Sequence, residues 1–285
     1  MLMTESETIS RRAFLKKVCL SLLGLGTMGA FYIMEERFWY QIRKVHLTIG
    51  NLPEAFKGWK IVQFSDVHFG FYYGAKQFRR VVRIINDLKP DILFFTGDLL
   101  DREWSEQLEL PSIIPLLQAL KAPRGGKWAV LGNHDYMSKN NVIQLLQDSQ
   151  FRVLINSHDY IDYNRQHLYI AGVDDYLFGK FDIKKTLQGL SDQDCVLLLA
   201  HEPDLADISC KFEISAQFSG HSHGGQIRLP FFKPFFTPEL AQKYIDGLYA
   251  VGESKMPLYV NRGVGTSNFP VRLFCRPEIT IFYLS

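Results

Sequence analysis

The chain of 285 residues has little cysteine, with four residues scattered at positions 19, 195, 210 and 275. No two of them form a Cys-x-x-Cys pair, so neither a thiolate zinc site nor a disulfide framework is indicated. The formal net charge is only +2 and no long basic run occurs outside the N-terminus, which argues against nucleic acid as a partner. Internal repeats and low-complexity segments are also lacking. With 47% hydrophobic and 22% charged residues, the composition is that of an ordinary globular protein.

The N-terminus has the layout of an export signal. Residues 10–16 read Ser-Arg-Arg-Ala-Phe-Leu-Lys, which matches the twin-arginine pattern, and Val18 to Met34 contains no charged residue. At about 1.5 Å per residue this run would span about 25 Å, the short limit of a transmembrane helix. No good Ala-x-Ala site follows. We therefore expect residues 1–34 to be either a cleaved twin-arginine signal or a retained membrane anchor, with the basic side in the cytoplasm.

The remainder alternates short apolar strands with polar loops and helices. This pattern predicts parallel neighbouring strands joined by right-handed crossovers, so that the strand ends converge at one edge of a sheet. The second half is richer in strands. We expect those at 152–155, 159–163 and 168–172 to be hairpin-like, and the last three to complete a second sheet. The strands are expected at 45–49, 60–65, 91–96, 127–131, 152–155, 159–163, 168–172, 195–200, 214–219, 248–252, 258–261 and 279–284, and the helices at 75–88, 105–120 and 182–187.

Five of these expected strands end in polar residues suited to metal binding. The candidate ligands offer only carboxylate, amide or imidazole donors: Asp66, His68, Asp98, Asn133, His201, His221 and His223. Mixed nitrogen and oxygen sets favour Mn, Fe, Zn, Co or Ni over Ca or Mg. Seven ligands exceed the needs of one catalytic ion and suit two ions that share a carboxylate, about 3.5 to 4 Å apart. Beside Asn133, His134 offers an imidazole, a side chain suited to acid–base chemistry, and Asp135 could orient its ring.

The order of these motifs resembles the calcineurin-like metallophosphoesterase superfamily. Asp-x-His, Gly-Asp, Gly-Asn-His-Asp, a single His and Gly-His-x-His occur in that order between residues 66 and 223, with no departure at a ligand position. The runs Gly-Gly-Gln-Ile at 224–227 and Asn-Arg-Gly-Val-Gly-Thr-Ser at 261–267, together with the leader, resemble the exported bacterial YkuE/YaeI-like branch. The resemblance covers nearly the whole chain after the leader.

The resemblance implies an α/β fold, a four-layer α/β/β/α sandwich of two mixed sheets flanked by helices, in residues 45–285, with residues 35–44 as a linker. It also implies two divalent ions, Mn, Fe or Zn. One ion would be bound by Asp66, His68 and His223. The other ion would be bound by Asn133, His201 and His221, and Asp98 would bind both ions. A hydroxide between the ions would attack phosphorus in a phosphoester or pyrophosphate bond. His134 would face the phosphate and protonate the leaving oxygen, with Asp135 holding its ring.

The motifs describe how phosphorus is attacked, and they leave the substrate open. We expect the substrate to be a phosphorylated small molecule or a lipid-linked phosphate, cleaved at or outside the cell membrane. The expected partners of the protein are the twin-arginine export machinery and the membrane or cell envelope. Two alternatives are a lipid-nucleotide pyrophosphatase of the UDP-2,3-diacylglucosamine type and a metal-containing envelope-binding protein without turnover. The presence of His134 beside the ligands argues against the second.

Two further features follow the ligand motifs. The stretch 229–236, Leu-Pro-Phe-Phe-Lys-Pro-Phe-Phe, cannot form a regular strand or helix and predicts an apolar loop. Its aromatic residues either pack beneath the loop or lie exposed and lead a lipidic substrate or membrane toward the metals. Arg262 precedes glycine after an expected strand, where it could contact a substrate phosphate bidentately or belong to a plain turn.

Overall fold

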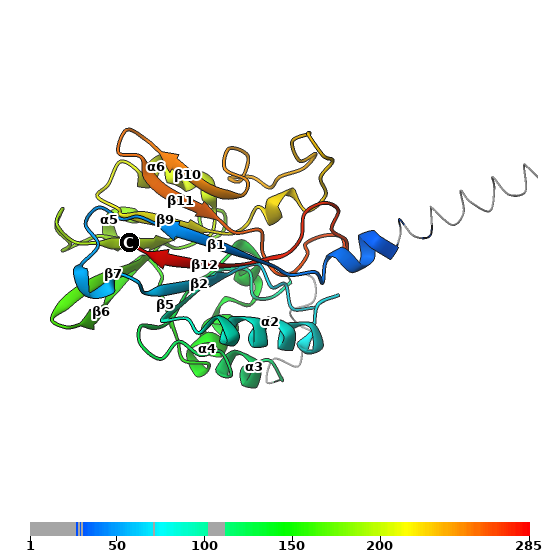
Figure 1. The fold of residues 1–285 in the computed structure, drawn as a ribbon, viewed down its shortest axis with the longest axis horizontal. Coiled ribbons are helices and arrows are strands. Elements are labelled where there is room, and N and C mark those ends of the chain that lie inside the picture. Colours follow the sequence, from blue (N-terminus) through cyan, green and yellow to red (C-terminus); the bar gives the residue numbers. More distant parts are fainter. Residues whose placement is uncertain (1–26, 28, 30, 71, 102–111) are drawn as a thin grey trace, which may run out of the picture.

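Two six-stranded mixed sheets pack face to face, and helices cover their outer faces (Figure 1). This architecture comes from a computed structural model, which describes residues 27, 29, 31–70, 72–101 and 112–285. The arrangement is the α/β/β/α sandwich expected from the sequence, and the predicted fold class is confirmed. Most of the predicted export signal, residues 1–26, lies outside the described residues.

The first sheet carries the parallel strands of the first half of the chain. Its strand order is β1 (Gln41–Leu47), β12 (Glu278–Leu284), β2 (Lys60–Phe64), β3 (Ile92–Thr96), β4 (Gly126–Val130) and β5 (Phe151–Val153). Strands β2 to β5 are parallel to one another, as strand and helix alternation predicts. The outer face of this sheet packs against α2 (Ala75–Leu88), α3 (Ile114–Gln118) and α4 (Lys139–Asp148).

The second sheet carries the remaining strands in the order β10 (Gly247–Val251), β11 (Met256–Val260), β9 (Ala216–Ser219), β8 (Val196–Leu199), β7 (Gln166–Gly172) and β6 (Ser157–Tyr163). Its outer face is covered by the short helices α5 (Ile183–Thr186) and α6 (Ala206–Ser209). The 3₁₀ turns within the described residues are η1 (Glu54–Phe56), η3 (Asn133–Ser138), η4 (Pro203–Leu205) and η5 (His223–Gly225).

Strands buried on both faces explain the continuous apolar runs in the sequence. Ile92 and Phe94 point into the layer between the two sheets, whereas Leu93 and Phe95 point toward the helices. The ring of Phe94 meets the ring of Phe218 from the other sheet at a centroid distance of 5.1 Å. The close-packed layer between the sheets therefore fixes the strand ends of one sheet relative to those of the other.

The structure corrects three details of the expected strand pattern. Strand β1 begins at Gln41, within the expected linker 35–44, because it pairs along its whole length with β12. Strand β12, expected in the second sheet, lies in the first, between β1 and β2. Strand β5 pairs with β4 and not with the β6–β7 hairpin. Pairing partners of short strands depend on tertiary packing, which apolar runs alone do not specify.

The expected helix at 105–120 is described only from residue 112. There, α3 begins at Ile114 with Pro115 in its first turn, where proline is tolerated because the N–H it lacks would have no helical partner. Among the described residues, no helix has the length and apolar character needed to cross a membrane.

Candidate metal centre

Seven candidate ligands meet where the ends of five strands converge. The loops after β2, β3 and β4 come from the first sheet, and the loops after β8 and β9 come from the second. Five of the seven residues adopt a left-handed backbone conformation that non-glycine residues rarely adopt, with φ between 49° and 66°. Such strain persists only where the surroundings enforce it, and it is typical of functional sites. These five residues are Asp66, His68, Asp98, His221 and His223.

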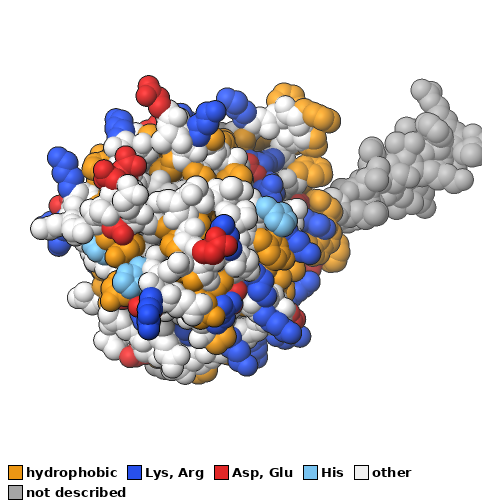
Figure 2. Space-filling view, turned by 60° about the vertical axis from the view of Figure 1, so that its left-hand side comes forward, with side chains coloured by type: hydrophobic (Ala, Val, Ile, Leu, Met, Phe, Trp, Pro, Cys, Tyr) orange, Lys and Arg blue, Asp and Glu red, His pale blue; other side chains and the backbone are white. Residues whose placement is uncertain are grey.

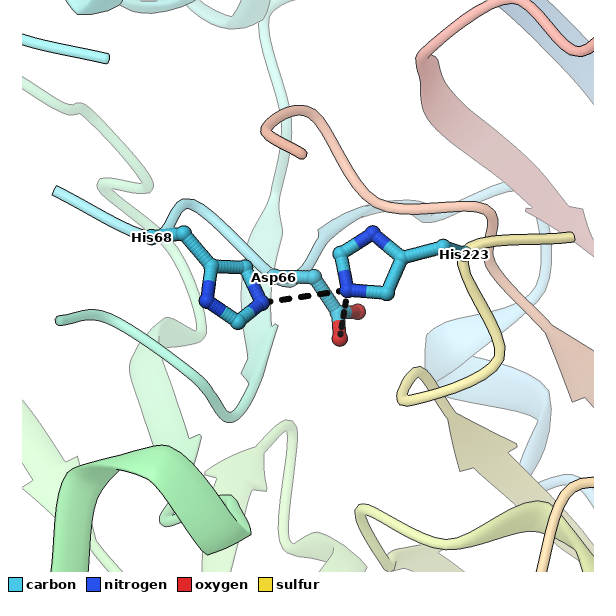
Figure 3. Close-up of side chains that lie close together, drawn as sticks. All are labelled: Asp66, His68 and His223. Atoms are coloured by element: carbon cyan, nitrogen blue, oxygen red, sulfur yellow. Dashed lines mark hydrogen bonds and ion pairs between the residues drawn. The ribbon is translucent and has the colours of Figure 1, made fainter. Parts of the chain in front are cut away.

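The first group of donors consists of Asp66, His68 and His223 (Figure 3). The Nε2 atoms of the two imidazoles lie 3.1 Å apart, and Nε2 of His223 lies 3.6 Å from Oδ1 of Asp66. All three residues are buried. Burial lowers the pKa of His68 to about 3 and that of His223 well below its usual value, so both rings are neutral and keep a lone pair for a cation.

The second group consists of Asp98, His201 and His221. Nδ1 of His201 donates to the carbonyl of Thr96 at 2.7 Å, and Nε2 of His221 donates to the carbonyl of Glu239 at 2.8 Å. A carbonyl can only accept, so the other nitrogen of each ring faces the centre, and these two nitrogens are 3.1 Å apart. Hydrogen bonding through one ring nitrogen is how metal-binding histidines are commonly oriented.

Asp98 connects the two groups. Its Oδ2 lies 3.6 Å from Nε2 of His68 and 3.2 Å from Nε2 of His201. Its Oδ1 accepts the backbone N–H of His134 at 2.8 Å. Burial alone would raise the pKa of this carboxyl, but the facing imidazoles, His201 first, hold it well below the usual value. An ionised carboxylate with one oxygen between two sets of donors is suited to contact two cations.

One unsatisfied polar atom and two facing imidazole nitrogens of the site fit a metal. Oδ1 of Asn133 is buried and has no hydrogen-bond partner within the described part of the chain, and the Nε2 atoms of His68 and His223 face each other at 3.1 Å. Leaving such an atom unpaired is costly unless water or an ion contacts the group. The donors are imidazole nitrogens and carboxylate or amide oxygens, the set that divalent Mn, Fe or Zn accepts. The residues present therefore fit a divalent metal.

His134 lies at the wall of a cavity of about 390 Å³ that opens over these donors. Its ring is half-buried and meets the ring of His68 edge-on at a centroid distance of 4.6 Å. Nitrogen atoms of His134 and His68 also come close to the Asp98 carboxylate, so geometry alone would allow His134 as a ligand. The cavity is otherwise bordered by polar residues, among them Ser222 and Asn268, and by apolar residues, among them Phe235, Phe236 and Phe269.

Asp135 has a role different from the one expected. Its buried carboxylate accepts four backbone N–H groups, those of Asp98 and Gly132 at Oδ2 and those of Leu99 and Leu100 at Oδ1, at 2.8 to 3.2 Å. A carboxylate has about four acceptor sites, so these four bonds occupy all of its capacity to accept hydrogen bonds. We therefore replace the expectation that Asp135 holds the His134 ring. It ties the loop that carries Asp98 to the loop that carries Asn133.

Arg262 also differs from expectation. Its guanidinium binds the carboxylate of Asp246, with Nε donating at 2.8 Å, and Nε lies 3.6 Å from Oε2 of Glu278. Arg228 donates to the same Asp246 at 2.9 Å. These ion pairs occupy the guanidinium, and Arg262 is not among the residues that border the cavity, so the structure favours a structural role over the predicted contact with a substrate phosphate.

Two residues that support the centre were missed by sequence reasoning. Gln63, buried on β2, donates to the carbonyl of Ser219 at the end of β9 and so links the two sheets directly beneath the ligands. Arg272 is fully buried and donates to the carbonyls of His223, Arg262, Gly263, Gly265 and Cys275. A Gln within an apolar strand was a detectable signal, whereas nothing in the local sequence distinguishes Arg272.

Comparison with known proteins agrees with the geometry. Residues 60–225 match the family model described as calcineurin-like phosphoesterase. The chain is 37% identical over 283 residues to the metallophosphoesterase YkuE of Bacillus subtilis, covering 97% of this chain and 98% of that protein. It is 28% identical to the phosphodiesterase YaeI of Escherichia coli, covering 97% of this chain and 99% of that one.

A transmembrane protein with a metallophosphoesterase domain from Danio rerio is 30% identical, covering 96% of this chain and 64% of that protein. Among solved structures, TT1561 of Thermus thermophilus matches with a TM-score of 0.47 and 10% identity, over 73% of this chain and 91% of that one. The family match together with the clustered His and Asp donors indicates divalent metal binding. The chain belongs to the calcineurin-like phosphoesterase family, and it is a metal-dependent phosphoester hydrolase.

Proposed function

We propose that the enzyme holds two divalent ions and hydrolyses a phosphoester or pyrophosphate bond above them. The observation that carries this proposal is the position of Asp98, whose Oδ2 faces His68 of one donor group at 3.6 Å and His201 of the other at 3.2 Å. A carboxylate shared between two donor groups is the usual feature of a two-ion site.

In this proposal Asp66, His68 and His223 bind one ion, Asn133, His201 and His221 bind the other, and Asp98 contacts both. Such ions, when bound, neutralise charge on the phosphoryl oxygens and supply a water acidic enough to be a nucleophile near neutral pH. The half-buried His134 at the cavity wall donates a proton to the leaving oxygen. Arg272 and Asp135 keep the ligand loops in place through their bonds to backbone groups.

The proposal extends to cellular location. The twin-arginine motif at 10–16 and the uncharged run at 18–34 support export of the enzyme, or its anchoring, with the catalytic domain at or outside the membrane. Export by the twin-arginine machinery transfers folded proteins, so the metal can enter before transfer. The substrate is then a phosphorylated small molecule or a lipid-linked phosphate of the envelope. A lipid-nucleotide pyrophosphate of the UDP-2,3-diacylglucosamine type is the second candidate.

The test combines metal analysis with hydrolysis of three substrates in the presence of Mn: a chromogenic monoester, a chromogenic diester and a nucleotide-diphosphate lipid. We expect two ions per chain in protein purified from its own envelope and activity that the Asp98→Asn variant abolishes. One ion per chain, or full activity in Asp98→Asn, would contradict the shared carboxylate. The preferred substrate separates a general phosphoesterase from the pyrophosphatase.

A further inference from the structure

The phenylalanines of the loop after η5 lie on the surface. The side chains of Phe231, Phe232, Phe235 and Phe236 are 105%, 68%, 71% and 67% exposed. The sequence left open whether they pack beneath the loop as a small core, and the structure shows that they do not. Large aromatic rings that gather on a surface at this exposure mark an interaction site, because single exposed apolar residues are normal and clusters are not.

These rings belong to a larger apolar surface, which we name the phenylalanine rim. It comprises the exposed residues Phe31, Met34, Leu229, Phe231, Phe232, Phe235, Phe236, Phe269 and Phe274. In Figure 1 the gold loop after η5, the orange-red loop before β12 and the blue N-terminal helix lie at the same end of the molecule. Figure 2 shows hydrophobic side chains gathered along the right-hand edge of the molecule.

Hydrogen bonds hold the three segments of the rim together. Nε2 of Gln226 donates to the carbonyls of Ser267 and Phe269 at 2.9 and 3.0 Å. The carboxylate of Glu36 accepts the backbone N–H groups of Phe274 and Cys275 at 2.8 and 3.0 Å. The rim is therefore one connected surface, made from parts of the chain that are far apart in sequence.

The rim is continuous with the metal cavity. Phe235, Phe236 and Phe269 belong to the rim and also border the cavity, whose other residues include Asp98 and His134. A molecule that enters this cavity with its phosphate toward the donors therefore keeps its other end against exposed aromatic rings. An apolar chain attached to the phosphate would suit that position.

Charge and sequence point to a lipid bilayer as the occupant. The segments 31–34, 229–238 and 267–274 contain no Asp or Glu, and their one exposed charge is Lys233, which suits an anionic surface. The uncharged run from Val18 to Met34 ends within the rim itself, through Phe31 and Met34. An apolar leader and an apolar rim that meet at one place can enter the same lipid surface.

We propose that the phenylalanine rim docks onto a lipid bilayer with the opening of the metal cavity toward it, so that the substrate is a phosphoester carried by a membrane amphiphile. In the reaction the water oxygen bonds to phosphorus, the P–O bond to the leaving group breaks, and the leaving oxygen takes a proton. The choice of substrate rests on the proposed hydrolysis, whereas the docking does not depend on it.

The docking is tested with the full chain carrying Phe231→Trp, mixed with vesicles of phosphatidylglycerol and phosphatidylethanolamine whose acyl chains are brominated. The fluorescence that the new tryptophan adds to that of wild type should fall by about half on brominated vesicles, because interfacial aromatic residues reach the acyl boundary, where bromine quenches them. Tyr160→Trp, an exposed position on β6 at the far end of the molecule, is the control and should not change. The docking would be overturned if the protein bound vesicles without this quenching, or if both variants were quenched equally. It would also be overturned if the emission of Phe231→Trp shifted with protein concentration in the absence of lipid.

The substrate class is tested by comparing a phosphoester lipid in vesicles with a soluble chromogenic diester. The Phe231→Ser/Phe232→Ser variant should hydrolyse the lipid about tenfold more slowly than wild type. Its activity on the soluble diester should be unchanged, since these two rings lie outside the cavity wall. The control Tyr160→Ser/Leu248→Ser, with exposed residues on β6 and β10, should match wild type on both substrates. Equal losses on both substrates, or none, would refute lipid delivery. If wild type cleaves neither substrate, the proposed function fails while the quenching result still decides the docking.

Discussion

The structure allows two roles for His134, and the two roles predict different behaviour when this residue is replaced. The ring can bind a metal together with His68 and Asp98, or it can face the substrate as a proton donor. We expect His134→Ala to keep its metal content and thermal stability and to lose about two to four powers of ten in kcat, the usual contribution of general acid catalysis. Metal analysis and turnover on one sample measure both quantities.

A matched variant sharpens this test. His68→Ala removes a fully buried imidazole from the first donor group, and it should lower the metal content as well as turnover. Should His134→Ala also lose metal, to the extent that His68→Ala does, His134 would be a ligand and the acid would have to be sought elsewhere in the cavity.

Replacement of Asp135, unlike replacement of His134, is expected to affect stability and metal binding. In Asp135→Asn, an amide N–H₂ would face backbone N–H groups that now donate to a carboxylate, so at least two donors lose their acceptor. We expect a loss of about 3 kcal/mol in the free energy of unfolding, together with weaker metal binding, because the Asp98 loop is no longer fixed. Denaturant unfolding and metal titration measure the two effects. A stable Asp135→Asn protein with normal metal affinity and reduced kcat would restore the originally expected role beside His134.

Among the elements, the strands of the first half could be predicted because their burial on both faces leaves continuous apolar runs, such as that of β3. The candidate ligands followed from the same pattern, since polar residues directly after buried strands converge at one edge. The placement of β12 between β1 and β2 could not be predicted, because it depends on the tertiary packing of segments that are far apart in the sequence. The pairing of Arg262 with Asp246 depends on a loop path that carries no periodic signal.

The loops that carry the candidate ligands approach each other so closely that Gly132 has no room for a side chain. A Cβ atom at Gly132, between β4 and η3, would lie 2.3 Å from Oδ1 of Asp98 and 2.6 Å from Cε1 of His201. Neither neighbour can move without displacing a ligand. We therefore expect Gly132→Ala to fold with reduced metal affinity and to lose at least about a hundredfold in kcat/KM, since misplacement by about 1 Å has this effect.

The control for this prediction is Gly50→Ala, because a Cβ at Gly50 meets no atom within 4 Å. That variant should equal wild type in metal titration and in turnover. Normal metal binding in Gly132→Ala would mean that the loops after β3 and β4 can separate, and that the close approach in the structure is not needed for the site.

For the whole molecule, the centre lies across the boundary between the two sheets. Asp66, His68 and Asp98 follow strands of the first sheet, whereas His201, His221 and His223 follow strands of the second. The direct polar link beneath them includes the bond from Gln63 to Ser219. Metal bound by both sets of ligands would join the two sheets, so metal affinity and folding stability should be linked.

Removal of metal should therefore lower the stability of the entire domain and not only its activity. At a free metal concentration about a hundred times the Kd, each bound ion adds about 2.7 kcal/mol, which for a protein of this size corresponds to a fall in Tm of about 5 to 10 °C per ion on chelation. Calorimetry with and without chelator measures this difference. In Asp98→Asn the difference should shrink, because the carboxylate between the two donor groups is lost. A Tm that chelation leaves unchanged in metal-loaded wild type would show that the ions do not join the sheets, and that packing between residues such as Phe94 and Phe218 holds the ligands in place without them.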